Sequence, residues 1–279
     1  MNNVSITSSK YPKYPARPNI MERTTGRVHQ QRESVAIPEH IPGYPQRIMI
    51  VFDWDDTIFP THHIFEKYGR VPRRNRMDTR DLKVFQELDE VIVQTLAHAR
   101  NIGKVFIVTD APKTWVEDTS RTLLPNVYRY LFRRKNGISI MSTSDMYTQS
   151  LCTTPQTCKD MAFDEIIARG ESGQRSSRRL KLINIGHSQY EQTSASSDYM
   201  NREQVVIKNV LVKPEPTIES LLLELTKLNN RLLEIASFKR STTFHYDGRR
   251  LKKERVSEIM RSQCPVSYTH LTLPTILLV

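Results

Sequence analysis

The stretch RIMIVFDWDDT, residues 47–57, decides the fold. Its first half, residues 48–52, is a continuously apolar run rich in β-branched side chains, which is typical of a strand buried on both faces of a sheet. Its second half places three carboxylates, Asp53, Asp55 and Asp56, directly after that strand. Strands buried on both faces occur mainly in parallel sheets that helices cover on either side. The stretch therefore predicts an α/β protein with acidic side chains gathered at a strand end.

Buried strands and amphipathic helices alternate along the chain after this stretch. Residues 81–100 repeat apolar side chains at helical spacing, and Gly103 ends the predicted helix. Further strands are predicted at 105–108, 138–141, 182–185 and 205–212, and further helices at 113–124, 159–168 and 218–236. This alternation predicts an α/β fold with an open, mainly parallel, Rossmann-like sheet of about five strands flanked by helices.

Composition divides the 279 residues into four segments. The first is rich in Pro, Ser and Arg without helical or strand period, so we expect a disordered basic leader. The second carries the alternating pattern. The third is basic and contains Asp247-Gly248, which predicts a short hairpin followed by a helix. The predicted segments are the leader (1–45), the α/β domain (46–238), the basic C-terminal extension (239–265) and a terminal segment (266–279).

The terminal segment contains VSYTHLTLPT, Val266 to Thr275. These residues resemble a one-frame translation of a common transposase sequencing adapter. We therefore exclude residues 266–279 from the predicted fold, as one would an expression scar. A genuine edge strand or tail is the alternative.

Charge and cysteine usage limit the functional classes. The chain has 41 Lys and Arg against 30 Asp and Glu, a formal net charge of +11. Basic segments at Arg70–Arg76 and Arg133–Lys135 could attract nucleic acid or another polyanion, although solvated loop charge is the commoner explanation. The three cysteines, Cys152, Cys158 and Cys264, are too few for a secreted disulfide framework and lack the paired spacing of a zinc site. The expectation is a reducing compartment, the cytoplasm or else the nucleus, with no membrane partner.

Clustered carboxylates at a strand end call for an explanation. In open parallel sheets, ligands bind beyond the carboxyl ends of the strands. Gathering like charges there costs free energy unless a cation or a reaction uses them. A helix-loop-helix calcium site is excluded because it needs Gly at its sixth position, where this chain has Ile58. Turn formation and helix capping by Asp are the structural alternative.

The strand followed by Asp-x-Asp-x-Thr, ending at Thr57, resembles the first motif of the haloacid dehalogenase superfamily. The resemblance implies a phosphomonoester hydrolase with a phosphoaspartyl intermediate. Asp53 would be the nucleophile, and Asp55 would protonate the leaving group and later activate water, roles that suit carboxyl groups. The resemblance also implies Mg²⁺, with Mn²⁺ or another divalent ion as the alternative, to screen Asp53 from the anionic phosphate.

Two later residues resemble further motifs of that superfamily. Thr109 ends the second predicted strand, where the family's hydroxyl bonds a phosphoryl oxygen. Thr109 as an ordinary strand residue, or Thr109 or Asp110 as the cap of the next helix, is the alternative. Lys159 precedes the fourth predicted strand, where the family's cation neutralises the phosphoaspartate. A solvated helix lysine is the alternative there.

The fourth motif departs from the family's pattern. After the strand at 182–185, His187 stands where a metal-binding carboxylate is expected, and Glu191 fits the later acid. The implied metal ligands are therefore Asp53, Asp55, His187 and Glu191. Mg²⁺ is usually held by carboxylates, so His187 puts catalysis in doubt. The alternative function is a catalytically weakened phosphate-binding or interaction protein that keeps the fold.

Segment lengths restrict the lids and partners that can be expected. Residues 58–80 and 110–158 are too short to hold the cap domain that many superfamily members carry. An open site suits a phosphate on a large molecule, so a macromolecular phosphorylated substrate is expected. The helix at 218–236 has a leucine-rich seam that could pair with a second copy. Packing on its own sheet is favoured, and a monomer is expected over a homodimer.

Overall fold

The computed structural model describes residues 47–133, 136–171, 179–187, 205–246 and 251–255. In these residues the chain forms an α/β fold with one seven-stranded sheet in the order β3-β2-β1-β4-β5-β6-β7. The first six strands are mutually parallel, and β7 pairs antiparallel with β6 at the edge. The strands are β1 (Ile48–Phe52), β2 (Lys104–Thr109), β3 (Ser139–Ser142), β4 (Leu180–Gly186), β5 (Val205–Leu211), β6 (Thr242–Tyr246) and β7 (Leu251–Arg255).

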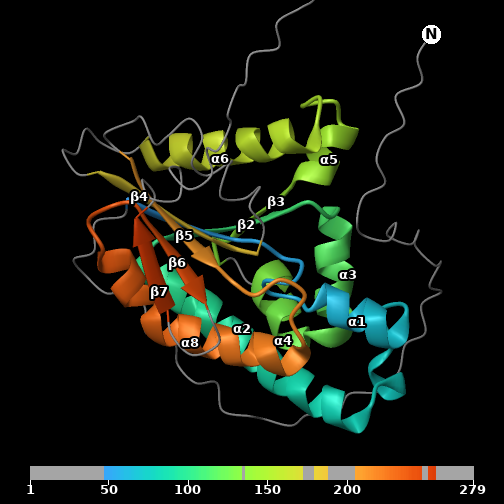
Figure 1. The fold of residues 1–279 in the computed structure, drawn as a ribbon. Coiled ribbons are helices and arrows are strands. Elements are labelled where there is room, and N and C mark those ends of the chain that lie inside the picture. The colour runs from blue at the N-terminus through green and yellow to red at the C-terminus, as the bar shows by residue number, and fades with distance from the viewer. Residues whose placement is uncertain (1–46, 134–135, 172–178, 188–204, 247–250, 256–279) are drawn as a thin grey trace, which may run out of the picture. The chain divides into compact units, whose positions relative to one another are not determined.

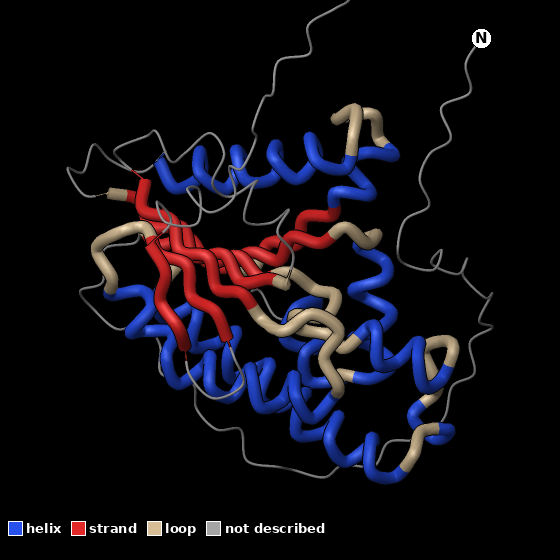
Figure 2. The backbone as a smooth tube through the Cα atoms, in the orientation of Figure 1, coloured by secondary structure: helices blue, strands red, loops and turns tan. Residues whose placement is uncertain are grey.

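Helices cover both faces of the sheet (Figures 1 and 2). α5 and α6 lie on one face, and α2 packs beside α8 on the other. The helical segments are α1 (Thr61–Tyr68), η1 (Arg74–Arg76), α2 (Thr79–Ile102), α3 (Lys113–Leu123), α4 (Pro125–Tyr128), the π-helical η2 (Arg129–Arg133), α5 (Thr143–Thr148), α6 (Pro155–Glu171) and α8 (Ile218–Ser237). The predicted open, mainly parallel, Rossmann-like sheet flanked by helices is confirmed.

The two core layers follow from strand alternation. On β1, Met49 and Val51 pack with Phe163 and Ile166 of α6. The intervening side chains of β1 point to the opposite face. All five residues of β1 are buried, as its apolar run predicts. Gly103 follows α2 at a point where the chain passes β1 so closely that a Cβ would lie 2.2 Å from the Ile48 carbonyl oxygen.

The predicted leucine-rich seam is buried within the chain. Six residues of α8 at helical spacing are at most 5% exposed: Ile218, Leu221, Leu225, Leu228, Leu232 and Ile235. This face of α8 packs toward α2 and the sheet. The leucine-rich seam is therefore buried within its own chain, as favoured from the sequence.

The sheet is larger than the sequence predicts. β6 pairs with β5, and the hairpin predicted around Asp247-Gly248 is formed by β6 and β7, although its connecting residues lie outside the described ranges. The sheet thus continues past Phe238, where the sequence places the end of the α/β domain. The helix predicted after the hairpin, the leader and the terminal segment also fall outside the described residues.

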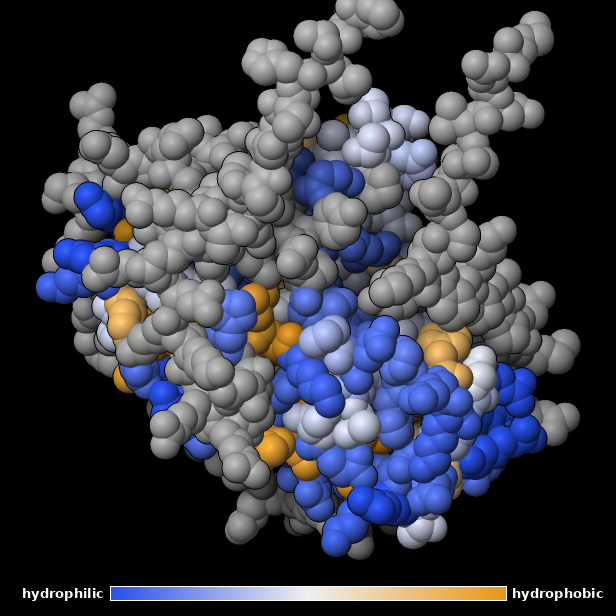
Figure 3. All heavy atoms as spheres, viewed as in Figure 1, coloured by the Kyte–Doolittle hydropathy of each residue, from blue (hydrophilic) through white to orange (hydrophobic). Residues whose placement is uncertain are grey.

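The described surface is mainly polar on the face viewed in Figure 3, where hydrophobic side chains form only small separate patches among the described residues. Among the described helices, none is long and apolar enough to cross a membrane. Residues 58–80 contain α1 and η1, and the described part of 110–158 contains short helices and β3. Neither stretch adds a cap domain within the described residues.

Glu224 of α8 gives stability a predicted pH dependence. It is 4% exposed, its Oε2 accepts the Lys213 backbone N–H at 3.3 Å, and burial raises its pKa from 4.5 to about 7. Between these pH values the folded state binds more protons than the unfolded state. The free energy of unfolding therefore falls as Glu224 ionises: the stability associated with its protonated form is fully present below pH 4.5 and is lost as the pH rises through 7. We expect Glu224→Gln to stabilise the fold at pH 8 by about 1–3 kcal/mol and to have little effect near pH 4.5.

Urea unfolding at pH 5 and pH 8 tests this expectation. Glu219→Gln is the matched control, because Glu219 also lies on α8 but its side chain is 43% exposed and pairs with Arg80. A Glu224→Gln effect of equal size at both pH values would contradict the proposed cause.

Candidate functional site

The strand order brings three strand ends together. β1 lies between β2 and β4, and Phe52 stands opposite Ile107 on one side and Ile185 on the other. The connection from β1 leads to β2, whereas the chain returns to β4 on the opposite flank of β1. This reversal makes the carboxyl end of β1 a switch point, where open α/β sheets form their ligand crevice. Asp53, Thr109 and His187 stand at this edge.

Asp53 is held at the edge by the neighbouring strand. Its backbone N–H donates to the Ile185 carbonyl at 3.0 Å, which continues the pairing of β1 with β4 by one residue. Its Oδ2 lies 3.3 Å from Nδ1 of His187, and its side chain is 7% exposed. The predicted nucleophile and the residue that departs from the family's pattern are therefore direct neighbours.

Asp55 is the most tightly bound carboxylate of the cluster. Its Oδ1 accepts the Thr61 hydroxyl at 2.5 Å and the Trp115 indole N–H at 2.9 Å, and its Oδ2 accepts the Thr109 hydroxyl at 3.4 Å. Burial raises the pKa of the Asp55 carboxyl from 3.8 to about 6, against the hydrogen bonds from Thr61 and Trp115, which lower it. A carboxyl group with such a pKa can be either acid or base near neutral pH.

Asp56 has a structural role. It lies in the left-handed region with φ 52°, and its backbone N–H donates to the Phe59 carbonyl at 2.8 Å. Its Oδ1 accepts the His62 backbone N–H at 2.8 Å in the first turn of α1. The capping alternative thus describes Asp56, whereas Asp53 and Asp55 face the strand ends.

An aromatic cluster supports the turn that carries these carboxylates. Phe59 stacks on Trp54 at 6.1 Å between ring centroids and meets Trp115 edge-on at 6.2 Å. Trp115 also stacks on Phe65 of α1 at 5.9 Å. The ring of Trp115 is thereby fixed while its N–H is directed at Asp55. Trp115 and Thr61 are site residues that the sequence did not predict, because their contact with Asp55 depends on tertiary packing.

Lys159 approaches the edge from α6. Its Nζ lies 3.0 Å from Oδ2 of Asp110, the residue after Thr109, and its side chain is 3% exposed. The Thr109 hydroxyl accepts the Ala111 backbone N–H at 3.1 Å and contacts Asp55. α3 begins after Pro112, and the backbone N–H of its first residue, Lys113, donates to Oδ2 of Asp145 at 3.0 Å, not to Thr109 or Asp110.

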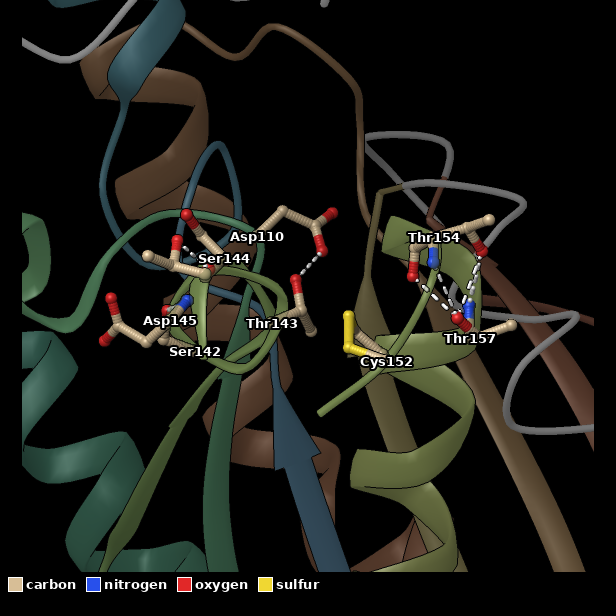
Figure 4. The surroundings of a disulfide bond; sticks show 10 residues. Asp110, Ser142, Thr143, Ser144, Asp145, Cys152, Thr154 and Thr157 are labelled. Atoms are coloured by element: carbon tan, nitrogen blue, oxygen red, sulfur yellow. Dashed lines mark hydrogen bonds between the residues drawn. A yellow bond between two sulfur atoms is a disulfide. The ribbon is translucent and has the colours of Figure 1, made fainter. Parts of the chain in front are cut away.

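A cysteine bridge precedes Lys159. Cys152 and Cys158 form a disulfide with a Cα–Cα distance of 5.2 Å, close to Asp110 and Thr143 in Figure 4. The cysteine count predicts a reducing compartment, and the sequence does not predict this pair. Three cysteines without a repeated spacing give no pairing signal, and the end of α5 and the start of α6 bring these two together.

The predicted metal ligands are brought together only in part. Asp53 and His187 are adjacent, but both oxygens of Asp55 already accept hydrogen bonds, and Glu191 lies outside the described residues. Among the described residues, no group of three or more His, Cys, Asp and Glu side chains is arranged to hold a metal ion. Of the four predicted ligands, the described residues thus bring together Asp53 and His187.

The basic segments make contacts inside the chain. Nη1 of Arg74 donates to the Leu123 carbonyl at 3.3 Å, and the guanidinium of Arg133 lies 5.8 Å from the Tyr128 ring centroid. Residues 134 and 135 are outside the described ranges. Both arginines thus have contacts within the chain.

Comparisons with protein-family models, curated proteins and solved structures gave no match for this chain.

Proposed function

We propose that this protein is a phosphomonoester hydrolase of the haloacid dehalogenase type that acts through a phosphoaspartyl intermediate. The observation that carries the proposal is the pair formed by Asp53 and Asp55 at the switch point of the sheet. Asp53 stands at the end of β1, and Asp55, two residues later, is a buried carboxyl group with a pKa of about 6. Such a pair offers a nucleophile and an acid-base group within one turn.

The reaction would proceed in two displacements. In the first, an oxygen of Asp53 attacks phosphorus, the bond to the leaving oxygen breaks, and protonated Asp55 gives its proton to that oxygen. In the second, the Asp55 carboxylate takes a proton from water, the water oxygen attacks the phosphoaspartate, and phosphate leaves with Asp53 restored. Lys159 would offset phosphate charge, and the Thr109 hydroxyl would exchange its long contact with Asp55 for a phosphoryl oxygen.

The proposed reaction requires a divalent cation, and we propose Mg²⁺ in preference to Mn²⁺. Its support is chemical, because a phosphate dianion must approach the carboxylate of Asp53 and a cation reduces that repulsion. A substrate whose phosphate projects from a large molecule is proposed, since α1 and η1 add no domain over the strand ends among the described residues. Purified protein assayed on p-nitrophenyl phosphate with Mg²⁺, Mn²⁺ or a chelator tests the function, and metal-dependent turnover is expected.

The contact between His187 and Asp53 favours a second candidate function. An imidazole 3.3 Å from the nucleophilic carboxylate occupies a place where the phosphate or its cation would approach. The second candidate is a phosphate-binding or interaction protein that keeps the fold and hydrolyses nothing. Absence of turnover in every metal, combined with measurable binding of inorganic phosphate, would favour it.

His187→Asp is expected to increase Mg²⁺-dependent turnover about tenfold or more, because Mg²⁺ prefers carboxylate oxygens whereas imidazole suits transition metals. The measurement is initial rate against Mg²⁺ concentration. His187→Asn is the matched control, since it removes the imidazole without adding a charge. Equal rates for the wild type and His187→Asp would contradict the view that His187 weakens the site.

A further inference from the structure

Lys159 and Asp110 form an asymmetric ion pair. The Lys159 side chain is 3% exposed, whereas the Asp110 side chain is 62% exposed. Asp110 comes from the end of β2 and Lys159 from α6, so the pair joins two elements that are 49 residues apart in sequence. A buried ammonium group needs a partner, because an uncompensated buried charge is strongly destabilising. Asp110 provides that partner from the rim of the site.

Asp110 is itself held in place. The Thr143 hydroxyl donates to Oδ1 of Asp110 at 2.7 Å, which leaves Oδ2 directed at Lys159. Figure 4 shows this bond between the first residue of α5 and Asp110. The preceding residue, Ser142, donates its hydroxyl to the Ala111 carbonyl at 2.8 Å. Two adjacent residues at the start of α5 thus fix the segment that carries Asp110.

The Lys159 ammonium needs a partner to fix its position because the lysine side chain is flexible. Its four-carbon side chain ends in a compact charge that can point in many directions, so position must come from a partner. A helix cap would be another use for Asp110, but the first backbone N–H of α3, that of Lys113, donates to Asp145. The disulfide joins Cys158, the residue before Lys159, to Cys152 and so restrains the start of α6.

We propose that Asp110 is a positioning residue that holds the Lys159 ammonium at the strand ends and shares it with the phosphoryl group of the substrate. The phosphate-sharing half of this inference rests on the proposed function, whereas the pairing half does not. Removing the carboxylate takes away the negative charge 3.0 Å from the buried Lys159 ammonium, which should then lose its proton more easily. The charge of Lys159 becomes the quantity to measure.

Pulse acetylation of the full-length protein with acetic anhydride, followed by mass spectrometry, measures this charge. The midpoint of the rate against pH reports protonation of Lys159, and the plateau reports its accessibility. An opened structure would raise the plateau and move the midpoint up toward that of a hydrated lysine, opposite to the shift expected from loss of Asp110. Lys83, exposed on α2, is the internal reference. We expect Asp110→Asn to lower the Lys159 midpoint by about one pH unit or more. Asp55 and His187 also interact electrostatically with Asp110, and both side chains are retained in this variant.

Two further variants sharpen the test. Asp145→Asn removes the same charge nearby, where the side chain binds the Lys113 backbone N–H, and should leave the midpoint unchanged. Asp110→Glu restores the carboxylate and should move the midpoint back toward the wild-type value. An unchanged midpoint in Asp110→Asn, or an equal fall in Asp145→Asn, would overturn the role of Asp110.

Inorganic phosphate separates the two halves of the inference. In the wild type, phosphate should slow acetylation of Lys159 relative to Lys83 and raise its midpoint, because it adds negative charge beside the ammonium. A midpoint that responds to Asp110→Asn but not to phosphate would overturn phosphate sharing while supporting the pairing role, and turnover of p-nitrophenyl phosphate decides the proposed function separately. Both responses together support the whole inference.

Discussion

Asp53→Asn is expected to reduce phosphatase turnover by about 10³-fold or more, as removal of a covalent nucleophile does in other enzymes. The amide has nearly the shape of the carboxylate, but it cannot attack phosphorus and form an acyl phosphate. The backbone N–H that donates to Ile185 is retained, so the fold should be kept. The measurement is the turnover number on p-nitrophenyl phosphate at saturating Mg²⁺, together with urea unfolding.

Asp56→Asn is the control for this loss. Asp56 adjoins the same cluster but caps α1 through Oδ1, and the oxygen of an Asn side chain can accept the same His62 N–H. Its turnover should therefore stay within a few-fold of the wild type. Substantial turnover in Asp53→Asn would show that another group attacks the phosphate.

Asp55→Asn is expected to lower turnover by about 10²–10⁴-fold, the usual contribution of a general acid or base. An amide cannot pass a proton to the leaving oxygen or take one from water. The loss should be largest for an alkyl phosphate, whose leaving group needs the proton, and smaller in the phosphorylation step of p-nitrophenyl phosphate, whose leaving group does not. Burst kinetics on both substrates separate the two steps.

Thr61→Val is a useful companion to Asp55→Asn, because it removes one hydrogen bond to Asp55 without removing the carboxyl group. It should reduce turnover much less than Asp55→Asn. If Asp55→Asn lost the same factor on both substrates and in both steps, the side chain would have a structural role in place of a proton-transfer role.

The sequence predicts the centre of this fold because each central element carries a local signal. β1 is an unbroken apolar run, and α2 repeats apolar residues at helical spacing before Gly103. α1 was not predicted, since THHIFEKY is short and has only two buried residues, Thr61 and Ile64. The hairpin predicted around Asp247-Gly248 accounts for β6 and β7. It does not predict that β6 joins the main sheet, because pairing with β5 is a contact between segments on either side of α8.

The candidate site divides in the same way. The positions of Asp53, Thr109 and His187 follow from strand ends, which periodicity indicates. The partners of Asp55 do not, because Trp115 and Thr61 reach it only after α3 and α1 have packed around the aromatic cluster. Pairing of Lys159 with Asp110 is likewise a tertiary contact. Glu191 lies outside the described residues, so its predicted role as a ligand stays a prediction.

Trapping the covalent intermediate is the direct test of whether Asp53 is the nucleophile. The wild type and Asp53→Asn would be mixed with a ³²P-labelled phosphomonoester, quenched in acid within the first turnover and mapped by peptide mass spectrometry. We expect a hydroxylamine-sensitive phosphoryl group on Asp53 that is absent from the variant. A phosphoryl group on His187, or steady turnover with no label on Asp53 at any time, would contradict it.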